Sequence, residues 1–153
     1  PRATVKALKL ERESAPAAAK VAVVSTRLPT HVAERQVKTV GAPTQIRLTP
    51  DRSSIKAEPG DLCYVTAEVV DQDGLVHPNA DHEIFFTIKG AGEIAAVGSG
   101  NPVSTERYRG NQRRAHRGRC LVVVRSQGES GAVRLRAQAD GLDGAEIIIE
   151  VAS

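Results

Sequence analysis

The sequence predicts an all-β protein organised as an antiparallel β-sandwich, and three observations lead to this prediction. The stretch from Asp61 to Gly74 alternates apolar and polar residues at period two, as a strand with one buried face does. Several shorter stretches repeat the pattern, and turn residues separate them at the spacing typical of a sandwich. A strand with one apolar face needs neighbours on both sides and a second layer above it.

Residues 1–42 differ in character from the rest of the chain. The segment from Arg12 to Lys20 is rich in alanine, is interrupted by a proline and has no sustained helical period. The segments Lys20–Thr26 and His31–Val40 each fit a strand. We interpret residues 1–42 as the tail of a preceding β-domain plus a linker, and residues 43–153 as the main domain. The chain contains no methionine and opens without a signal segment, so we expect it to be a piece of a longer protein.

The main domain begins with a strand that is broken in the middle. Ile46 and Leu48 start it, Pro50–Asp51 interrupts it, and Ile55–Ala57 resumes it, as is common where an edge strand switches sheets. The long strand at residue 61 follows, with Cys63, Val65, Ala67 and Val69 inward and Tyr64, Thr66 and Glu68 outward. The later strands are expected at Glu83–Lys89, Glu93–Val97, Arg119–Ser126, Ala132–Ala139 and Ala145–Val151. Seven to eight antiparallel strands in this order predict an immunoglobulin-like sandwich.

The composition excludes a membrane helix and argues against a nucleic-acid binder. Hydrophobic residues make up 41% and charged residues 25%, and no apolar run approaches the roughly 20 residues of a membrane helix. The net charge is +3, but six arginines and one glutamate between Thr105 and Arg119 give +5, so the remainder sums to −2. The positive charge is therefore local, and the chain has only four aromatic residues for stacking on bases.

No pattern in the sequence predicts a metal site, a cofactor or a catalytic residue. Asp71-Gln72-Asp73-Gly74 resembles the start of a calcium loop, but its glycine comes two positions early and the later bidentate acid is absent, which favours a hairpin turn. The histidines at 31, 77, 82 and 116 have no zinc spacing. Asp81 and Glu83 alternate onto the solvent side of a strand, so we do not expect them to form a facing pair of acids.

The two cysteines, Cys63 and Cys120, both fall on inward faces and are 57 positions apart. That separation is compatible with a disulfide between sheets, and two buried free thiols are the alternative. The strand order places the two cysteines on neighbouring strands of one sheet, where a disulfide is geometrically awkward. This favours free thiols.

The segment from Gly98 to Gly118 is the least regular part of the domain. It is about 20 residues long without a clear period, and loops of that length are usually functional or bound to a partner. It contains an arginine cluster with four alternative roles. The cluster could be plain solvated surface, dock on an acidic neighbouring domain, bind nucleic acid, or contact a sugar or an anionic group. The first two alternatives are favoured. The members are Arg107, Arg109, Arg113, Arg114, Arg117 and Arg119.

Two long runs carry a resemblance to a known family: GAPTQIRLTPDRSSIKAEPGDLCYVTAEVVDQDG and NADHEIFFTIKGAGEIAAVGSGNPVSTERYRGNQRRAHRGRCLVVVRS. The most specific part is Gly100-Asn101-Pro102 with Ser104 and Glu106, the arginine-rich stretch, and the strand end Val124-Arg125-Ser126. From Gly41 to Val151 the chain resembles the C-terminal immunoglobulin-like domain of family 2 glycoside hydrolases of the beta-galactosidase type. Residues 1–40 lack the tryptophan and the Asn-Gly-Lys turn expected of the preceding domain.

The resemblance implies a parent enzyme whose TIM barrel carries two catalytic glutamates and acts by retention. No barrel residue is present, so the chain would be a non-catalytic accessory domain that needs no cofactor. The implied partners are the other domains of the parent, with a second subunit or a carbohydrate as further options, and the parent is expected in the periplasm or outside the cell. Candidate interface or glycan contacts are Asn101, Glu106, Arg107, Arg109, Arg113 and Arg114. A bacterial adhesin-type repeat and an independent carbohydrate-binding module are the alternatives.

Overall fold

The computed structural model describes residues 10–12, 18–24 and 32–153, and the chain divides into two units, Pro1–Thr39 and Val40–Ser153. The first unit holds a three-stranded antiparallel sheet in the order β1-β2-β3. The expected break at Pro16 lies outside the described residues, and the assignment of residues 1–42 to a preceding domain stays a prediction. The strands of this unit are β1 (Leu10–Arg12), β2 (Ala18–Val24) and β3 (Val32–Lys38).

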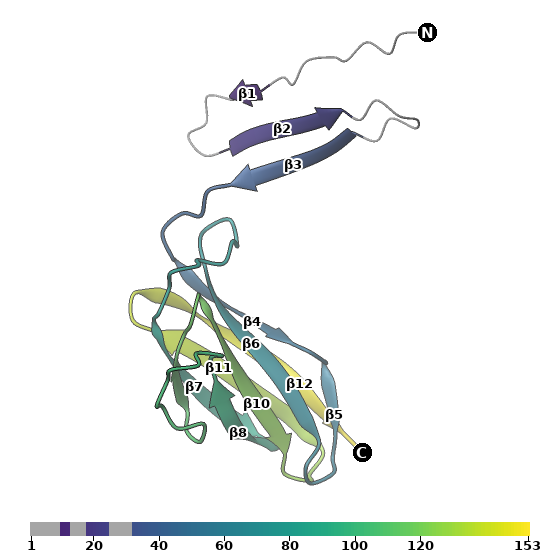
Figure 1. The fold of residues 1–153 in the computed structure, drawn as a ribbon. Coiled ribbons are helices and arrows are strands. Elements are labelled where there is room, and N and C mark those ends of the chain that lie inside the picture. Colours follow the sequence, from purple (N-terminus) through teal and green to yellow (C-terminus); the bar gives the residue numbers. More distant parts are fainter. Residues whose placement is uncertain (1–9, 13–17, 25–31) are drawn as a thin grey trace. The chain divides into compact units, whose positions relative to one another are not determined.

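The second unit is a β-sandwich of two layers (Figure 1). One layer has the order β8-β10-β6-β4 and the other the order β12-β11-β7-β9, and one parallel pairing, Asp143 with Gln45, joins them along one side. This confirms the predicted immunoglobulin-like sandwich. Its strands are β4 (Gln45–Pro50), β5 (Ser54–Lys56), β6 (Leu62–Val70), β7 (Glu83–Gly90), β8 (Gly92–Gly98), β9 (Gln112–Arg114), β10 (Arg119–Ser126), β11 (Gly131–Ala139) and β12 (Leu142–Ala152).

The broken first strand switches layers, as its sequence predicts. β4 pairs antiparallel with β6, whereas β5 pairs parallel with β12 in the other layer. Asp51 marks the point of departure, because its backbone N–H donates to the carbonyl of Tyr64 at 2.9 Å while its carboxylate accepts the N–H of Tyr64 at 2.9 Å. The Asp51 carboxylate replaces the backbone acceptor that is lost when the chain turns away. The backbone N–H of Tyr64 therefore keeps a hydrogen-bond partner at the end of the β4–β6 pairing.

The core lies between the layers and is built from alternate residues of the central strands. The inward residues of β6, from Cys63 to Val69, are all buried, which confirms the predicted alternation. Cys63 and Cys120 are both buried free thiols on the neighbouring strands β6 and β10. Burial raises the pKa of Cys63 to about 11 and that of Cys120 to about 12, so both act as small apolar side chains. Other core residues are Ile46, Ile55, Ile84, Phe86, Val97, Val122, Val124, Val133, Leu135, Ala137, Ile149 and Val151.

The turn at Asp71 folds the chain back on the end of β6, as the predicted hairpin turn does, because Val76 bridges antiparallel to Val70. Gly74 has φ 78° and its N–H donates to the Asp71 carbonyl, and the chain then crosses to β7 in the other layer. The buried carboxylate of Asp71 accepts the N–H groups of Asp73, Leu75 and Gly41 at 2.8 to 3.0 Å. One side chain therefore caps the turn and anchors the start of the sandwich.

The adjacent phenylalanines of β7 provide a test of the layer assignment. Phe86 is 1% exposed in the core, whereas Phe85 points outward and is 42% exposed. We expect Phe86→Ala to lower the free energy of unfolding by about 3–5 kcal/mol, because it leaves a cavity in a packed interior. The matched change Phe85→Ala removes only cross-strand contacts and is expected to change it by no more than about 1 kcal/mol. Urea unfolding of the two variants measures both values, and equal losses would contradict the layer assignment.

Candidate functional site

The segment between β8 and β10 crosses from one layer to the other and back. It leaves β8, forms β9 along the edge of β7 in the opposite layer, and returns to β10. The sequence did not reveal β9, because three residues are too few to show a period. Gly118 (φ 75°) closes the segment at a point where an added Cβ would lie 2.3 Å from the carbonyl oxygen of His77. Only glycine fits there without displacing the backbone of the β6–β7 crossover.

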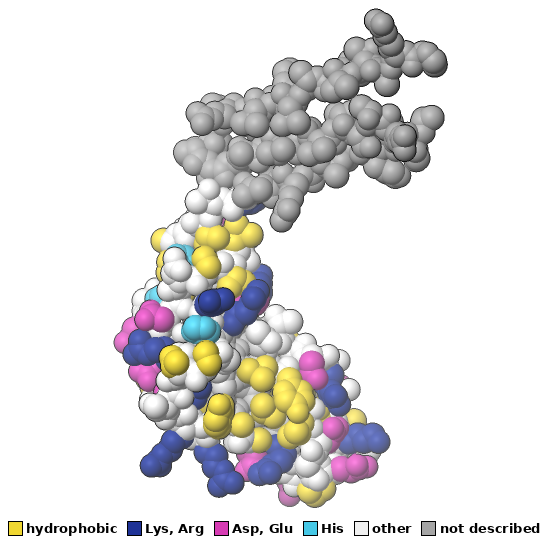
Figure 2. All heavy atoms as spheres, in the orientation of Figure 1, with side chains coloured by type: hydrophobic (Ala, Val, Ile, Leu, Met, Phe, Trp, Pro, Cys, Tyr) yellow, Lys and Arg dark blue, Asp and Glu magenta, His cyan; other side chains and the backbone are white. Residues whose placement is uncertain are grey.

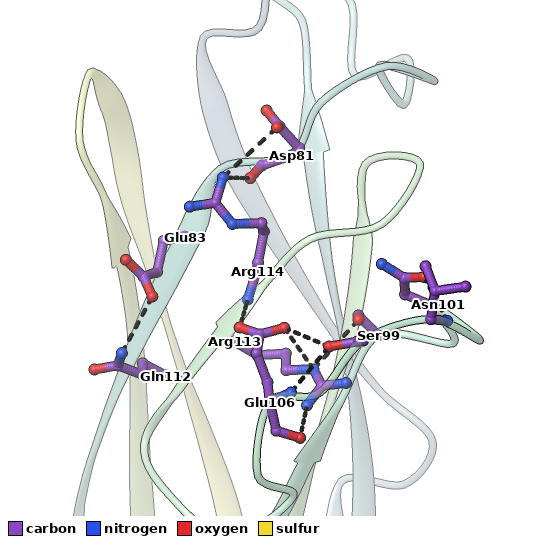
Figure 3. Close-up of polar contacts among 10 residues, drawn as sticks. Asp81, Glu83, Ser99, Asn101, Glu106, Gln112, Arg113 and Arg114 are labelled. Carbon is purple, nitrogen blue, oxygen red and sulfur yellow. Dashed lines mark hydrogen bonds and ion pairs between the residues drawn. The ribbon is translucent and has the colours of Figure 1, made fainter.

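Arg113 is buried in the middle of this segment. Strand alternation in β9 turns its side chain inward, where it is 1% exposed, while Gln112 and Arg114 point outward. Its Nε donates to Ser99 Oγ at 3.2 Å, and its Nη1 donates to the carbonyl of Glu106 at 3.1 Å (Figure 3). The guanidinium also lies 5.2 Å from the centroid of the Tyr108 ring. One planar cation thus ties the start of the segment, its middle and β9 together.

Glu106 supplies the counter-charge for Arg113. One carboxylate oxygen, Oε2, lies 3.5 Å from Arg113 Nε and accepts the hydroxyl of Ser104 at 2.9 Å. The other, Oε1, accepts the backbone N–H of Arg114 at 3.2 Å. Burial acts to raise the pKa of Glu106, but the Ser104 hydroxyl, the Arg114 amide and the two arginine charges outweigh it, so the pKa lies below its ordinary value. Glu106 is ionised at neutral pH and its oxygens are committed within the segment.

The outward residues next to Arg113 are also paired within the domain. Arg114 points away from Arg113 and its Nη1 reaches both the carbonyl and the carboxylate of Asp81, at 3.3 and 3.6 Å (Figure 3). Gln112 donates to Glu83 on β7 at 3.1 Å. Asn101 accepts the N–H of Val103 and forms a turn that carries Ser104 to Glu106. These contacts hold the segment against β7 and against itself.

Arg119, at the start of β10, belongs to a row of charges that crosses the layer formed by β10, β6 and β4. It pairs with Glu68 at 2.9 Å, and Glu68 also binds Arg47 at 2.6 Å. The three residues stand opposite one another on β10, β6 and β4. Burial acts to raise the pKa of Glu68, but hydrogen bonds from both arginines outweigh it and lower the pKa.

The arginine cluster therefore divides into three groups. Arg113 is interior, and Arg114 and Arg119 are paired on the surface. Arg107, Arg109 and Arg117 are exposed and form no hydrogen bond or ion pair with any other residue that the structure describes.

Arg113, a candidate interface or glycan contact, is buried and stabilises the segment from within, and its role in an external contact stays a prediction. Asn101, Glu106 and Arg114 are likewise engaged within the domain, and of the six candidates only Arg107 and Arg109 remain without a partner among the described residues.

The sequence did not predict a role for Ser99 and Tyr108, because their shared contact is the guanidinium of Arg113, whose burial was not predicted. Arg107 and Arg109 are exposed chain neighbours of the exposed Tyr108.

The described part of the chain shows no helix fit to cross a membrane, and no group of three or more histidine, cysteine or acidic side chains placed to hold a metal ion.

Comparisons with known proteins agree with the resemblance seen in the sequence. The family model for the glycoside hydrolase family 2 C-terminal domain 5 matches residues 46–148. Beta-galactosidase BoGH2A of Bacteroides ovatus is 49% identical over 111 residues, which are 72% of this chain and 13% of that protein. A beta-galactosidase of Thermoanaerobacter pseudethanolicus is 30% identical over 107 residues, or 70% of this chain and 13% of that protein. The crystal structure of a glycosyl hydrolase family 2 member from Bacteroides cellulosilyticus matches with a TM-score of 0.81 and 34% identity, over 90% of this chain and 17% of that one.

The buried guanidinium yields a prediction about stability. We expect Arg113→Ala to lower the free energy of unfolding by about 3 kcal/mol, because it removes hydrogen bonds made by a charged group and breaks the ion pair with Glu106. The exposed neighbour provides the control, since Arg109→Ala is expected to change stability by less than about 0.5 kcal/mol. Denaturant unfolding measures both variants, and an Arg113→Ala loss as small as that of Arg109→Ala would contradict the assigned role.

The lowered pKa of Glu106 yields a prediction about pH. A carboxylate whose pKa is lower in the folded than in the unfolded chain stabilises the fold at pH values above the unfolded pKa, and this contribution is lost as the pH falls through the folded pKa. The stability difference between the wild type and Glu106→Gln should therefore be largest at neutral pH and shrink below the ordinary value of 4.5. Unfolding curves from pH 7 downward measure this, with the exposed Glu129→Gln as control; a difference independent of pH would show that the charge is unimportant.

Proposed function

The chain belongs to the glycoside hydrolase family 2 C-terminal domain 5 family, and from this premise we propose that it is a non-catalytic accessory domain of a longer glycoside hydrolase. The observation that carries the proposal is the family match over residues 46–148, together with the small share that the chain represents of its relatives, 13% of each curated protein. Both of those relatives are named beta-galactosidases, so we propose a β-galactoside as the substrate of the longer protein. Hydrolysis would take place in a barrel domain outside these 153 residues.

The proposed role of the domain is structural. The long segment between β8 and β10 is fixed by Arg113 and Glu106 within the domain, so the sandwich presents a rigid surface. Other domains of the same polypeptide are the proposed partners. Contact with a second subunit or with a carbohydrate would have to use side chains that the domain leaves free, of which Arg107, Arg109 and the ring of Tyr108 are the candidates.

The 49% identity to a beta-galactosidase supports this role over an adhesin-type repeat. An independent carbohydrate-binding module normally stacks sugars on exposed aromatic rings. Among the described residues, the exposed aromatic side chains are Tyr64, Tyr108 and Phe85. Phe85 lies in the other layer from Tyr64, so the three do not form one stacking surface.

Hydrolysis of a nitrophenyl β-galactoside tests the proposal directly. We expect the full-length protein to hydrolyse it and the isolated 153-residue chain to give no rate above buffer. Titration of the isolated chain with galactosides and plant glycans is the companion measurement, for which we expect no saturation at micromolar concentration. Turnover by the isolated chain would show that it is catalytic, and micromolar affinity would identify a carbohydrate-binding module. A full-length protein that hydrolyses no glycoside would overturn the assignment to a glycosidase.

A further inference from the structure

The strand β10 is apolar on both of its faces, in contrast to β11. Between Leu121 and Val124 every side chain of β10 is aliphatic, although only Val122 and Val124 point into the core. In β11 the inward Val133, Leu135 and Ala137 alternate with exposed, polar Arg134, Arg136 and Gln138. A strand that meets water on its outer face shows the second pattern, whereas a strand covered on both faces shows the first.

The strand register gathers the outward apolar side chains into one patch. Val123 stands between Tyr64 on β6 and Ala96 on β8, and Leu121 stands between Thr66 on β6 and Gly98 on β8. The ring of Tyr108 lies against Gly98, because a Cβ added to that glycine would be 3.8 Å from the Cε1 atom of Tyr108. Tyr64 is 43% and Tyr108 is 67% exposed, while the other side chains are half-buried. We call this patch the Tyr64 face; its members are Tyr64, Ala96, Tyr108, Leu121 and Val123.

Figure 2 shows the hydrophobic side chains gathered over β6, β8 and β10, with charged side chains around them. The outer face of the opposite layer is different. There Phe85 and Ile148 are exposed, but Lys89, Arg134, Arg136 and Glu146 occupy the rows of β7, β11 and β12 around them. Single exposed apolar residues are ordinary, whereas a contiguous patch on one face indicates an interaction surface.

The charges that border the Tyr64 face indicate what kind of surface it meets. On one side Glu68 is paired with Arg47 and Arg119, and on the other Glu93 is paired with Arg125. The carboxylates along the border are therefore already neutralised. Arg107 and Arg109, the chain neighbours of Tyr108, are exposed and have no partner among the described residues. The free charge at this border is positive, so the complementary surface carries carboxylates.

We propose that the Tyr64 face docks on another domain of the same polypeptide, one that presents apolar side chains bordered by carboxylates. This rests on the proposed function, because the relatives contain far more polypeptide than this chain, which covers 13% of each curated one. Covalent linkage keeps such a domain at high effective concentration. A second copy of the chain fits less well, because a two-fold contact brings the same patch onto itself and offers no free carboxylate to Arg107 and Arg109.

Thiol labelling of Val123→Cys tests the proposal. The substitution keeps a small apolar side chain on the face and leaves Tyr64 in place, and the native thiols contribute little background because they are buried. Labelling of residue 123 is followed by peptide mass spectrometry in the isolated chain and in the full-length protein. We expect it to be slower in the full-length protein by at least about tenfold, the ratio that corresponds to about 1.4 kcal/mol of docking free energy. Ile148→Cys, on the outer face of the other layer, should label at the same rate in both.

The contribution of the free arginines is measured in the same assay. In the full-length Val123→Cys protein, the double change Arg107→Glu and Arg109→Glu should restore fast labelling, because it places negative charge against the carboxylates of the partner surface. The matched change Lys89→Glu and Arg136→Glu, at exposed positions of the opposite layer, should leave the labelling rate as it was.

Three results would overturn the proposal: equal Val123→Cys rates in the two proteins, slow labelling that also depends on the concentration of the isolated chain and so identifies a second copy, or protection of Ile148→Cys instead. The glycosidase assay keeps the two proposals separate. A full-length protein that hydrolyses the galactoside while residue 123 labels fast refutes only this docking surface. A full-length protein that protects residue 123 but hydrolyses no glycoside refutes only the assignment to a glycosidase.

Discussion

The burial of one guanidinium group, that of Arg113, sets the conformation of the whole segment between β8 and β10. A cation can be buried only if its donors and its charge are met, and Ser99 and Glu106 meet them from within the segment. Ser104 and the amide of Arg114 then fix the carboxylate. Because these contacts draw the start and the middle of the segment onto β9, the chain can leave one layer and pair with the other. The position of Tyr108 on the outer face of the first layer follows from this arrangement.

The two layers of the sandwich share a core but have different outer surfaces. β11 and its neighbours present long charged side chains, which remain hydrated in any free-standing domain. β10 and its neighbours present aliphatic and aromatic side chains between two rows of paired charges. Pairing leaves no isolated carboxylate to be desolvated when such a surface is covered, and an isolated buried ion is the costlier case. The sandwich is therefore one-sided, with one layer suited to contact and the other to solvent.

Period-two alternation was enough to predict most strands of the sandwich, because each has one buried face. The central strand, the switch of the first strand between layers and the neighbouring positions of the cysteines all follow from it. The burial of Arg113 could not be predicted. A three-residue strand is too short to show a period, and an arginine within an arginine-rich stretch is expected to be exposed. The role of Asp71 was hidden for a similar reason, because one of its partners, Gly41, lies thirty positions away. The outward Leu121 and Val123 were visible as a continuous aliphatic run, and the meaning of that run depends on the layer in which β10 lies.

The residues that carry the resemblance most specifically in the sequence are largely those that shape the loop. Asn101 forms a turn, Ser104 and Glu106 hold the carboxylate network, and the arginine that follows them is buried. A motif of this kind identifies a fold and need not identify a ligand, because its polar atoms form their hydrogen bonds and ion pairs within the domain. Residues that contact another domain have to satisfy a different condition, since they must remain exposed in the isolated sandwich. Tyr64, Tyr108 and the two arginines beside Tyr108 satisfy it, so the specificity of this domain for its neighbour lies beside the family motif and not within it.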